Sequence, residues 1–152
     1  MKGILRELIT DDSIQFDVVA KDRDQAISLA GEILVKQKKV NSSYISAMIK
    51  NCEEFGPYIV LAPGLAIPHA APNAGIKELG VSCVILSEPV VFGNEENDPV
   101  KLVICIASPD SKSHLELLSA LSTIVMNPQR LKQLECARTK QEFLQLIDKL
   151  SE

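Results

Sequence analysis

Several features that indicate particular classes of protein are missing from this sequence. Basic residues are not in excess, because 16 lysines and arginines stand against 20 acidic residues and give a formal charge of −4. This is the wrong sign for a protein that reads the phosphate backbone of nucleic acids. Long apolar runs are missing as well, since Tyr58 to Ile67 and Leu102 to Ala107 fall well short of the roughly 20 residues that a membrane-spanning helix needs. We therefore expect no nucleic-acid partner and no direct insertion into a membrane.

The signals of an exported protein are missing too. Residues 1–7 carry charges every few positions and contain no apolar run of the kind that a signal peptide requires. The four cysteines are far apart, lie within apolar segments and show no C-x-x-C spacing: Cys52, Cys83, Cys105 and Cys136. We therefore expect a cytoplasmic protein with reduced, buried thiols.

Glycine-rich nucleotide loops and metal-binding motifs are also missing. The seven glycines form neither a G-x-x-x-x-G-K-S/T loop nor a G-x-G-x-x-G turn, so bound nucleotide is not expected. There is no H-E-x-x-H pair, and two histidines without a cysteine cluster make a poor zinc site, although carboxylates could complete one. The acidic stretch Glu95 to Asp98 offers paired carboxylates, but charged loop tips are usually solvated. We expect neither a cofactor nor a metal.

What is present is the composition of a single globular domain spanning residues 1–152. The chain is 46% hydrophobic and 24% charged, and we find no linker, repeat or low-complexity tract that would divide it. A chain of this length buries about two-thirds of its surface on folding. This is enough to build a core of its own.

The periodicity of the apolar residues predicts alternating strands and helices. Residues 14–19 alternate like a strand, and residues 22–37 place apolar side chains at helical spacing. A second helix is predicted with Ser42 as its cap. Segments within residues 58–107 are rich in β-branched residues between turn signals, which predicts strands. Residues 102–107 do not alternate, so this last strand is expected to be covered on both faces.

Three further helices are predicted after the strands. The first covers residues 111–126, the second begins with Asn127-Pro128, and the third begins with the capping box Thr139-x-x-Glu142. The predicted order is strand, two helices, three strands and three helices. This order indicates an α/β protein with a three-layer α/β/α sandwich around a small mixed sheet.

His69 stands at the end of an apolar strand, directly after Leu65 to Pro68. The fixed dihedral angle of Pro68 orients the exit of the chain, so the His69 side chain is expected at the rim of the sheet. The carboxyl edge of an α/β sheet is where such folds usually place ligands. From residue type alone, a histidine that only bonds a loop carbonyl is the better explanation.

His114 lies in the first turn of the helix predicted from about Ser111. Leu117, Leu118 and Leu121 follow three, four and seven residues later, so His114 shares the helix face that packs on the sheet. It points inward at the positive end of the helix, which favours an anion held by free backbone N–H groups and the imidazole together. Taken alone, His114 is better explained as a half-buried polar spacer.

The two histidines are more informative as a pair. If the ends of the strand and of the helix meet at one rim, His69 and His114 face each other around a small dianion such as a phosphoryl group. About three-quarters of an imidazole with a pKa near 6.5 is neutral at pH 7, which provides a nitrogen lone pair without a separate base. One ring can attack phosphorus while the other donates a hydrogen bond to the phosphoryl oxygens. The pair therefore predicts a phosphoryl-transfer site.

The segment Gly64 to His69 resembles the G-x-A-x-P-H signature of phosphotransferase-system enzyme IIA domains of the mannitol/fructose type. The resemblance continues in the expected order through Pro89 to Gly93, Asn97 to Val100, and Ser113 to Leu115 with the leucine-rich helix. Residues 44–63 are closely similar to the ascorbate-specific branch. The resemblance covers nearly the whole chain, and the family fold, a three-layer sandwich around a small mixed sheet, agrees with the predicted order of elements.

The resemblance implies a role for each histidine. His69 would accept a phosphoryl group on Nε2 from the histidine-containing phosphocarrier protein, HPr, and His114 would be the second active-site histidine. The phosphoryl group would then pass to enzyme IIB, which in the ascorbate branch accepts it on a cysteine, while the sugar acid crosses the membrane through enzyme IIC. The acidic balance of the chain suits docking to HPr, whose interaction face is expected from the family to be basic.

Two positions depart from the patterns of this family. Asn51 stands where the mannitol and nitrogen-regulatory branches typically carry an arginine, although the ascorbate branch shares the asparagine. Ala71 stands where many ascorbate-type members have an arginine. Both departures remove a positive charge from the expected rim, which shifts stabilisation of a phosphoryl group onto His114 and backbone donors.

Two alternatives to a sugar-transport role stay open at this point. The first is a regulatory enzyme IIA-like module whose phosphorylation state controls a transcription factor or a transporter. The second is a non-catalytic relative in which both histidines are structural. Acceptance of the phosphoryl group by a cognate enzyme IIB distinguishes the transport role from the regulatory one.

Overall fold

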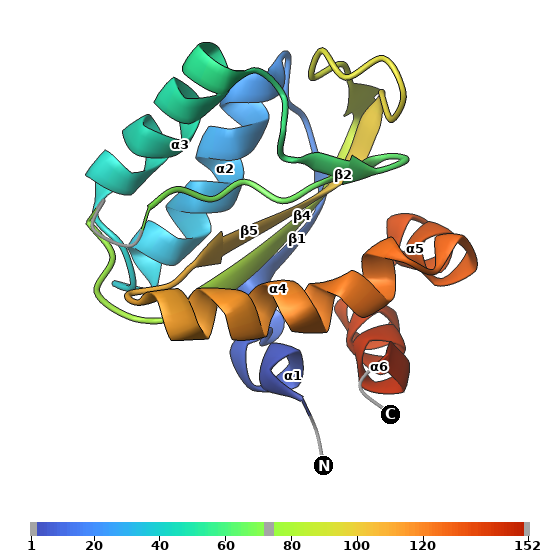
Figure 1. Ribbon diagram of the computed structural model, residues 1–152. Coiled ribbons are helices and arrows are strands. Elements are labelled where there is room, and N and C mark those ends of the chain that lie inside the picture. Colours follow the sequence, from blue (N-terminus) through green and yellow to red (C-terminus); the bar gives the residue numbers. More distant parts are fainter. Residues whose placement is uncertain (1–2, 72–74, 151–152) are drawn as a thin grey trace.

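The computed structural model describes residues 3–71 and 75–150 of the protein, and in this part of the chain a five-stranded mixed sheet lies between two layers of helices (Figure 1). The strands are β1 (Ile14–Val18), β2 (Val60–Ala62), β3 (Leu65–Ala66), β4 (Gly80–Val90) and β5 (Val100–Ala107). The helices are α1 (Ile4–Leu8), α2 (Arg23–Lys36), α3 (Ser42–Phe55), α4 (Ser111–Val125), α5 (Pro128–Glu135) and α6 (Lys140–Leu150), with a short 3-10 helix at Asp11–Ser13. The predicted three-layer α/β/α class is confirmed.

The strands lie in the order β1-β4-β5-β3-β2. β1 is parallel to β4, β4 is antiparallel to β5, and β3 is parallel to β5. The parallel pair β3 and β5 is the one that matters for the site, because the carboxyl ends of parallel strands reach the same edge of a sheet. His69 follows β3 and α4 follows β5, so the two expected site segments leave the sheet at one edge.

The sheet is buried on both faces, which explains the unbroken apolar run in β5. Leu102, Ile104 and Ile106 point into a core shared with α1, α4, α5 and α6, while Val103 and Cys105 point into a core shared with α2 and α3. All residues from Leu102 to Ala107 are buried, as the lack of alternation predicts. Figure 1 shows these two helix layers on opposite sides of the sheet.

Side-chain caps define where several helices begin. Asp22, Asp110 and Asn127 accept hydrogen bonds from the backbone N–H three residues later at the starts of α2, α4 and α5. The predicted Ser42 cap is one residue late, because Asn41 is the N-cap of α3 and makes no side-chain cap bond. Thr139 does cap the start of α6, since its hydroxyl accepts from the Glu142 N–H.

The order of elements differs from the predicted order in two places. A helix, α1, precedes β1; its five residues are too few for a helical period to be recognised in the sequence. Four strands, rather than three, lie between α3 and α4, because β2 and β3 form a hairpin around Pro63-Gly64. Gly64 has φ +79°, a left-handed conformation that suits glycine at this turn.

The prediction of buried thiols is correct for three cysteines and wrong for the fourth. Cys52, Cys83 and Cys105 are buried, whereas Cys136 at the end of α5 is exposed. Its position follows from the short α5, which turns only Leu131 and Leu134 into the core. Within residues 3–71 and 75–150, no helix has the length and apolar character needed to cross a bilayer.

Candidate active site at the ends of β3 and β5

His69 is held at the edge of the sheet by bonds on both sides of it in the chain. The Ile106 N–H of β5 donates to the carbonyl oxygen of Pro68 over 3.1 Å, and the Ala70 N–H donates to the Tyr44 hydroxyl over 3.0 Å. The His69 side chain is partly buried. The rim position predicted from the Pro68-His69 sequence is therefore the observed one.

A backbone contact determines which nitrogen of His69 is free. The Nδ1 atom lies 2.7 Å from the carbonyl oxygen of Ile67. A carbonyl oxygen can only accept, so Nδ1 must carry the proton and donate. In the neutral ring the lone pair is then on Nε2, which is the nitrogen available to act as a nucleophile.

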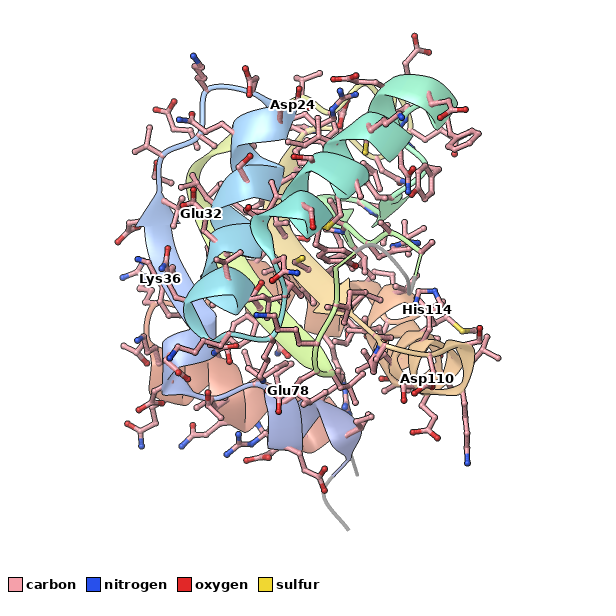
Figure 2. All side chains as sticks on the ribbon, turned by 90° about the vertical axis from the view of Figure 1, so that its left-hand side faces the viewer. Asp24, Glu32, Lys36, Glu78, Asp110 and His114 are labelled. Atoms are coloured by element: carbon pink, nitrogen blue, oxygen red, sulfur yellow. The ribbon has the colours of Figure 1, made fainter. Side chains whose placement is uncertain are left out.

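His114 lies at the same edge of the sheet, on the helix that follows β5. It is partly buried in the first turns of α4, where Leu117 and Leu121 on the same face are fully buried. The ring centroids of His69 and His114 are 5.3 Å apart, and the ring planes are tilted by 49°. Figure 2 shows His114 with Asp110 at the beginning of α4, at the periphery of the molecule. The two imidazoles therefore meet at one rim, as the sequence predicts.

The surroundings of His69 favour its neutral form. Burial is the main cause that lowers the pKa of His69 below its ordinary value of 6.5, and the charge of His114 acts in the same direction. The hydrogen bond to the Ile67 carbonyl opposes both effects, because it favours the protonated ring. The net result is a larger neutral, nucleophilic fraction at and below neutral pH than a solvent-exposed histidine would have.

This shift predicts a pH dependence of stability. The ordinary value, 6.5, describes His69 in the unfolded chain, and the folded value is lower. As the pH falls below about 6.5 the unfolded state takes up a proton first, so the free energy of unfolding decreases until the folded pKa is passed. Above about 6.5 both states are neutral and the contribution is constant. We expect urea denaturation between about pH 5 and pH 8 to show this decrease.

The matched control for this measurement is His69→Gln, which removes the titrating group and keeps a side chain that can donate to Ile67. The difference in free energy of unfolding between the two proteins should depend on pH below about 6.5 and be constant above it. Carboxylates titrate in both proteins and cancel in this difference. A difference that is flat across the whole range would contradict the lowered pKa.

Tyr58 completes one side of the site and was not predicted from the sequence. Its ring meets that of His69 edge-on, with centroids 5.6 Å apart and planes at 90°. Its hydroxyl donates a long hydrogen bond of 3.4 Å to the His69 carbonyl oxygen. Burial raises the pKa of Tyr58, and a hydrogen bond with the Asn51 side chain opposes that shift. The chain has two tyrosines and two histidines, and all four lie around this segment, but only folding brings Tyr58 to His69.

The anion site expected at the beginning of α4 is occupied in part by the protein itself. The Asp110 carboxylate accepts from the Ser113 N–H over 2.7 Å, and the His114 N–H bonds the Asp110 carbonyl. Hydrogen bonds with Ser113 lower the pKa of Asp110, so this carboxylate is ionised. A second anion would have to share the helix end with a negative charge. The expectation of free backbone donors there is therefore wrong in part.

The remaining candidate groups are accounted for by structural roles. Asp98 of the acidic stretch accepts from the N–H groups of Phe92 and Gly93 and so holds its own loop together. Asn51, at the position of the absent arginine, acts to lower the pKa of Tyr58, and Ala71 is exposed just after the site. Among the residues that the structure describes, no group of three or more histidine, cysteine or acidic residues is arranged to hold a metal ion.

Comparison with known families gives one match that spans almost the whole chain. Residues 7–150 match the family described as phosphoenolpyruvate-dependent sugar phosphotransferase system, EIIA 2. The chain is also 35% identical over 147 residues to the ascorbate-specific PTS system EIIA component of Escherichia coli (strain K12), which covers 95% of this chain and 96% of that protein.

Solved structures agree with this match. The mannitol-specific cryptic phosphotransferase enzyme IIA of Escherichia coli has a TM-score of 0.86 and 32% identity, over 95% of this chain and 98% of that one. Enzyme IIA for mannitol from Escherichia coli, solved in complex with phosphorylated enzyme IIB, has a TM-score of 0.81 and 27% identity, over 91% of this chain and 96% of that one.

Proposed function

The chain belongs to the EIIA 2 family of the phosphoenolpyruvate-dependent sugar phosphotransferase system, and we propose that it accepts a phosphoryl group from phospho-HPr on Nε2 of His69 and passes it to an enzyme IIB. Membership of this family makes the protein a phosphotransferase component. The observation that carries the residue assignment is the pair of imidazoles with centroids 5.3 Å apart at the sheet edge. His69 is the acceptor of the pair because its Nδ1 is engaged by the Ile67 carbonyl.

The proposed transfer balances with the groups that are present. The Nε2 lone pair of His69 attacks the phosphorus of phospho-HPr, a new N–P bond forms, and the N–P bond of the donor histidine breaks. The donor nitrogen recovers its lone pair, so no proton has to be removed from His69. The phosphorylated ring keeps its proton on Nδ1, and the Ile67 carbonyl stabilises the positive charge that develops there. Phosphoryl transfer depends mainly on positioning and charge stabilisation, which this arrangement supplies.

His114 is proposed to donate a hydrogen bond to the phosphoryl oxygens. It is the second ring at the site, and an imidazole donor can stabilise the negative charge that the three oxygens share in the transition state. The Asp110 carboxylate at the beginning of α4 accepts a hydrogen bond from the Ser113 N–H. Because this N–H is already bonded, the helix end can stabilise the phosphoryl oxygens less, and the His114 ring has to stabilise them more.

The downstream partner and the substrate follow from the relatives. One solved relative forms a complex with phosphorylated enzyme IIB, and a curated relative at 35% identity is named ascorbate-specific. We therefore propose an ascorbate-type enzyme IIB as the acceptor and ascorbate as the transported sugar acid. A cytoplasmic location follows from these partners. The acidic balance of the chain, −4, supports docking of a basic face of HPr.

The proposal is tested by following labelled phosphate along the relay. Incubation with phosphoenolpyruvate, enzyme I and HPr should add one phosphate that is labile in acid and stable in base, as expected of phosphohistidine. Addition of purified enzyme IIB proteins of ascorbate, mannitol and fructose type should then deplete the label, fastest with the ascorbate type. Failure to gain label would overturn the proposal. Label that no enzyme IIB accepts would favour the regulatory alternative instead.

A further inference from the structure

We propose that the hydroxyl group of Tyr44 is a positioning element of the site, which fixes the backbone of His69 at a set distance from β5. This inference rests on the proposed role of His69 as phosphoryl acceptor. Tyr44 lies in α3, is fully buried, and its ring belongs to the core between α2, α3 and the sheet. Its hydroxyl, however, reaches through that core to the backbone of two other segments.

The evidence lies in the hydrogen-bond ladder between β3 and β5. The parallel register pairs Leu65 with Leu102 and Ala66 with Val103, and its continuation aligns His69 with Ile106. In a parallel ladder a residue bonds the two neighbours of its partner, one through its N–H and one through its C=O. The N–H of Ile106 follows this rule and bonds the carbonyl of Pro68 over 3.1 Å. The rule assigns the carbonyl of Ile106 to the N–H of Ala70.

The Tyr44 hydroxyl stands in place of that second bond. It accepts from the Ala70 N–H over 3.0 Å and donates to the Ile106 carbonyl over 2.6 Å. Before His69 the two segments are joined by the regular backbone hydrogen bond. After His69 the tyrosine oxygen stands between the backbone donor and the backbone acceptor, so the two segments are further apart. The chain bends away from β5 at the residue that carries the proposed nucleophile.

Through these bonds the positions of both histidines depend on one residue of β5, Ile106. Ile106 bonds the residue before His69 directly and the residue after it through Tyr44. Four residues beyond Ile106, Asp110 begins α4, which carries His114. Burial raises the pKa of Tyr44 well above its usual range, so the hydroxyl keeps the proton that it donates to Ile106. The separation of the two imidazoles therefore depends on this hydroxyl.

The test replaces one atom. Tyr44→Phe keeps the buried ring and removes the oxygen, so the Ala70 N–H must either close onto the Ile106 carbonyl or lose its partner. The first result moves the His69 segment toward β5, and the second leaves the backbone after His69 without its restraint. Ser82→Ala is the matched control, because the Ser82 hydroxyl is also fully buried and also donates to a carbonyl, that of Ala30, over 2.7 Å. That bond runs to α2 and includes neither histidine.

Two readouts separate positioning from general stability. The first is the titration of His69 followed by NMR of its ring nitrogens in the unphosphorylated protein. The second is the rate of phosphorylation by phospho-HPr. Both variants should fold and lose similar stability, whereas Tyr44→Phe alone should shift the His69 titration and slow phosphorylation about threefold to tenfold.

The outcomes are distinct for this inference and for the proposed function. Equal effects of Tyr44→Phe and Ser82→Ala on the His69 titration and on the rate would overturn the inference, because Tyr44 would then act only as a core residue. A parent protein that gains no phosphate would overturn the proposed function. The titration of the unphosphorylated protein would in that case still decide whether Tyr44 positions His69.

Discussion

Replacement of His69 by alanine is expected to abolish phosphorylation of the protein by phosphoenolpyruvate, enzyme I and HPr. The imidazole supplies the lone pair that forms the N–P bond, and alanine offers no nucleophile in its place. The Ile67 carbonyl fixes the proton on Nδ1 of His69, so the phosphate of the parent protein should be found on Nε2. NMR of the phosphorylated ring nitrogens measures this directly.

The control for His69→Ala is a test that the variant is still folded. Circular dichroism and thermal unfolding should show a folded variant, because His69 lies at the edge of the sheet and is only partly buried. Base-stable, acid-labile label that persists in a folded His69→Ala protein would place the acceptor elsewhere, with His114 the next histidine to consider. Phosphate on Nδ1 of the parent would contradict the tautomer assigned from the Ile67 contact.

The position of His69 could be predicted from sequence because it depends on local chemistry. The apolar residues before it form a strand, and Pro68 fixes the exit of the chain. His114 was predicted for a similar reason, since helical spacing places it on the face of Leu117 and Leu121, both of which are buried. Neither local pattern sets the distance between the two rings. Their approach to 5.3 Å depends on the parallel pairing of β3 with β5, which links positions far apart in the chain.

The two tyrosines of the site show where sequence reasoning ends. Tyr44 lies at helical spacing with Met48 and so is expected in the core, which is where its ring is found. Nothing in the spacing indicates that its hydroxyl enters a strand ladder 26 residues further along the chain. The sequence predicts strands from residue 58 onward, but β2 begins only at Val60, so Tyr58 lies outside the strand and its ring meets that of His69. Such contacts depend on tertiary geometry that no local pattern encodes.

The absence of an arginine at Asn51 changes how the site can hold a phosphoryl group. An arginine at this position could form two hydrogen bonds to phosphate oxygens. Here the Asn51 side chain acts to lower the pKa of Tyr58, whose ring packs edge-on against His69. This position therefore supplies no positive charge to the site. Under the proposed mechanism, stabilisation of the phosphoryl oxygens then falls mainly to His114, so replacement of His114 should have a large effect.

Replacement of His114 by alanine is expected to leave a folded protein that is phosphorylated, and passes its phosphate on, much more slowly than the parent. Loss of one hydrogen bond to a charged group costs about 1.5 to 3 kcal/mol. In the transition state this corresponds to a rate lower by about 10- to 150-fold. Rapid-quench measurement of labelled phosphate transfer from HPr, and then to enzyme IIB, gives both rates.

Two further variants show whether the effect belongs to the His114 ring. His114→Gln keeps a side chain that donates a hydrogen bond, so it should recover part of the rate that alanine loses. Ser119→Ala changes an exposed residue of the same helix, roughly 140° around its axis from His114, and should transfer at the parent rate. A His114→Ala protein that transfers as fast as the parent would make His114 a packing residue only. Because His69 would then act without its neighbour, the 5.3 Å approach of the two rings would no longer explain the chemistry.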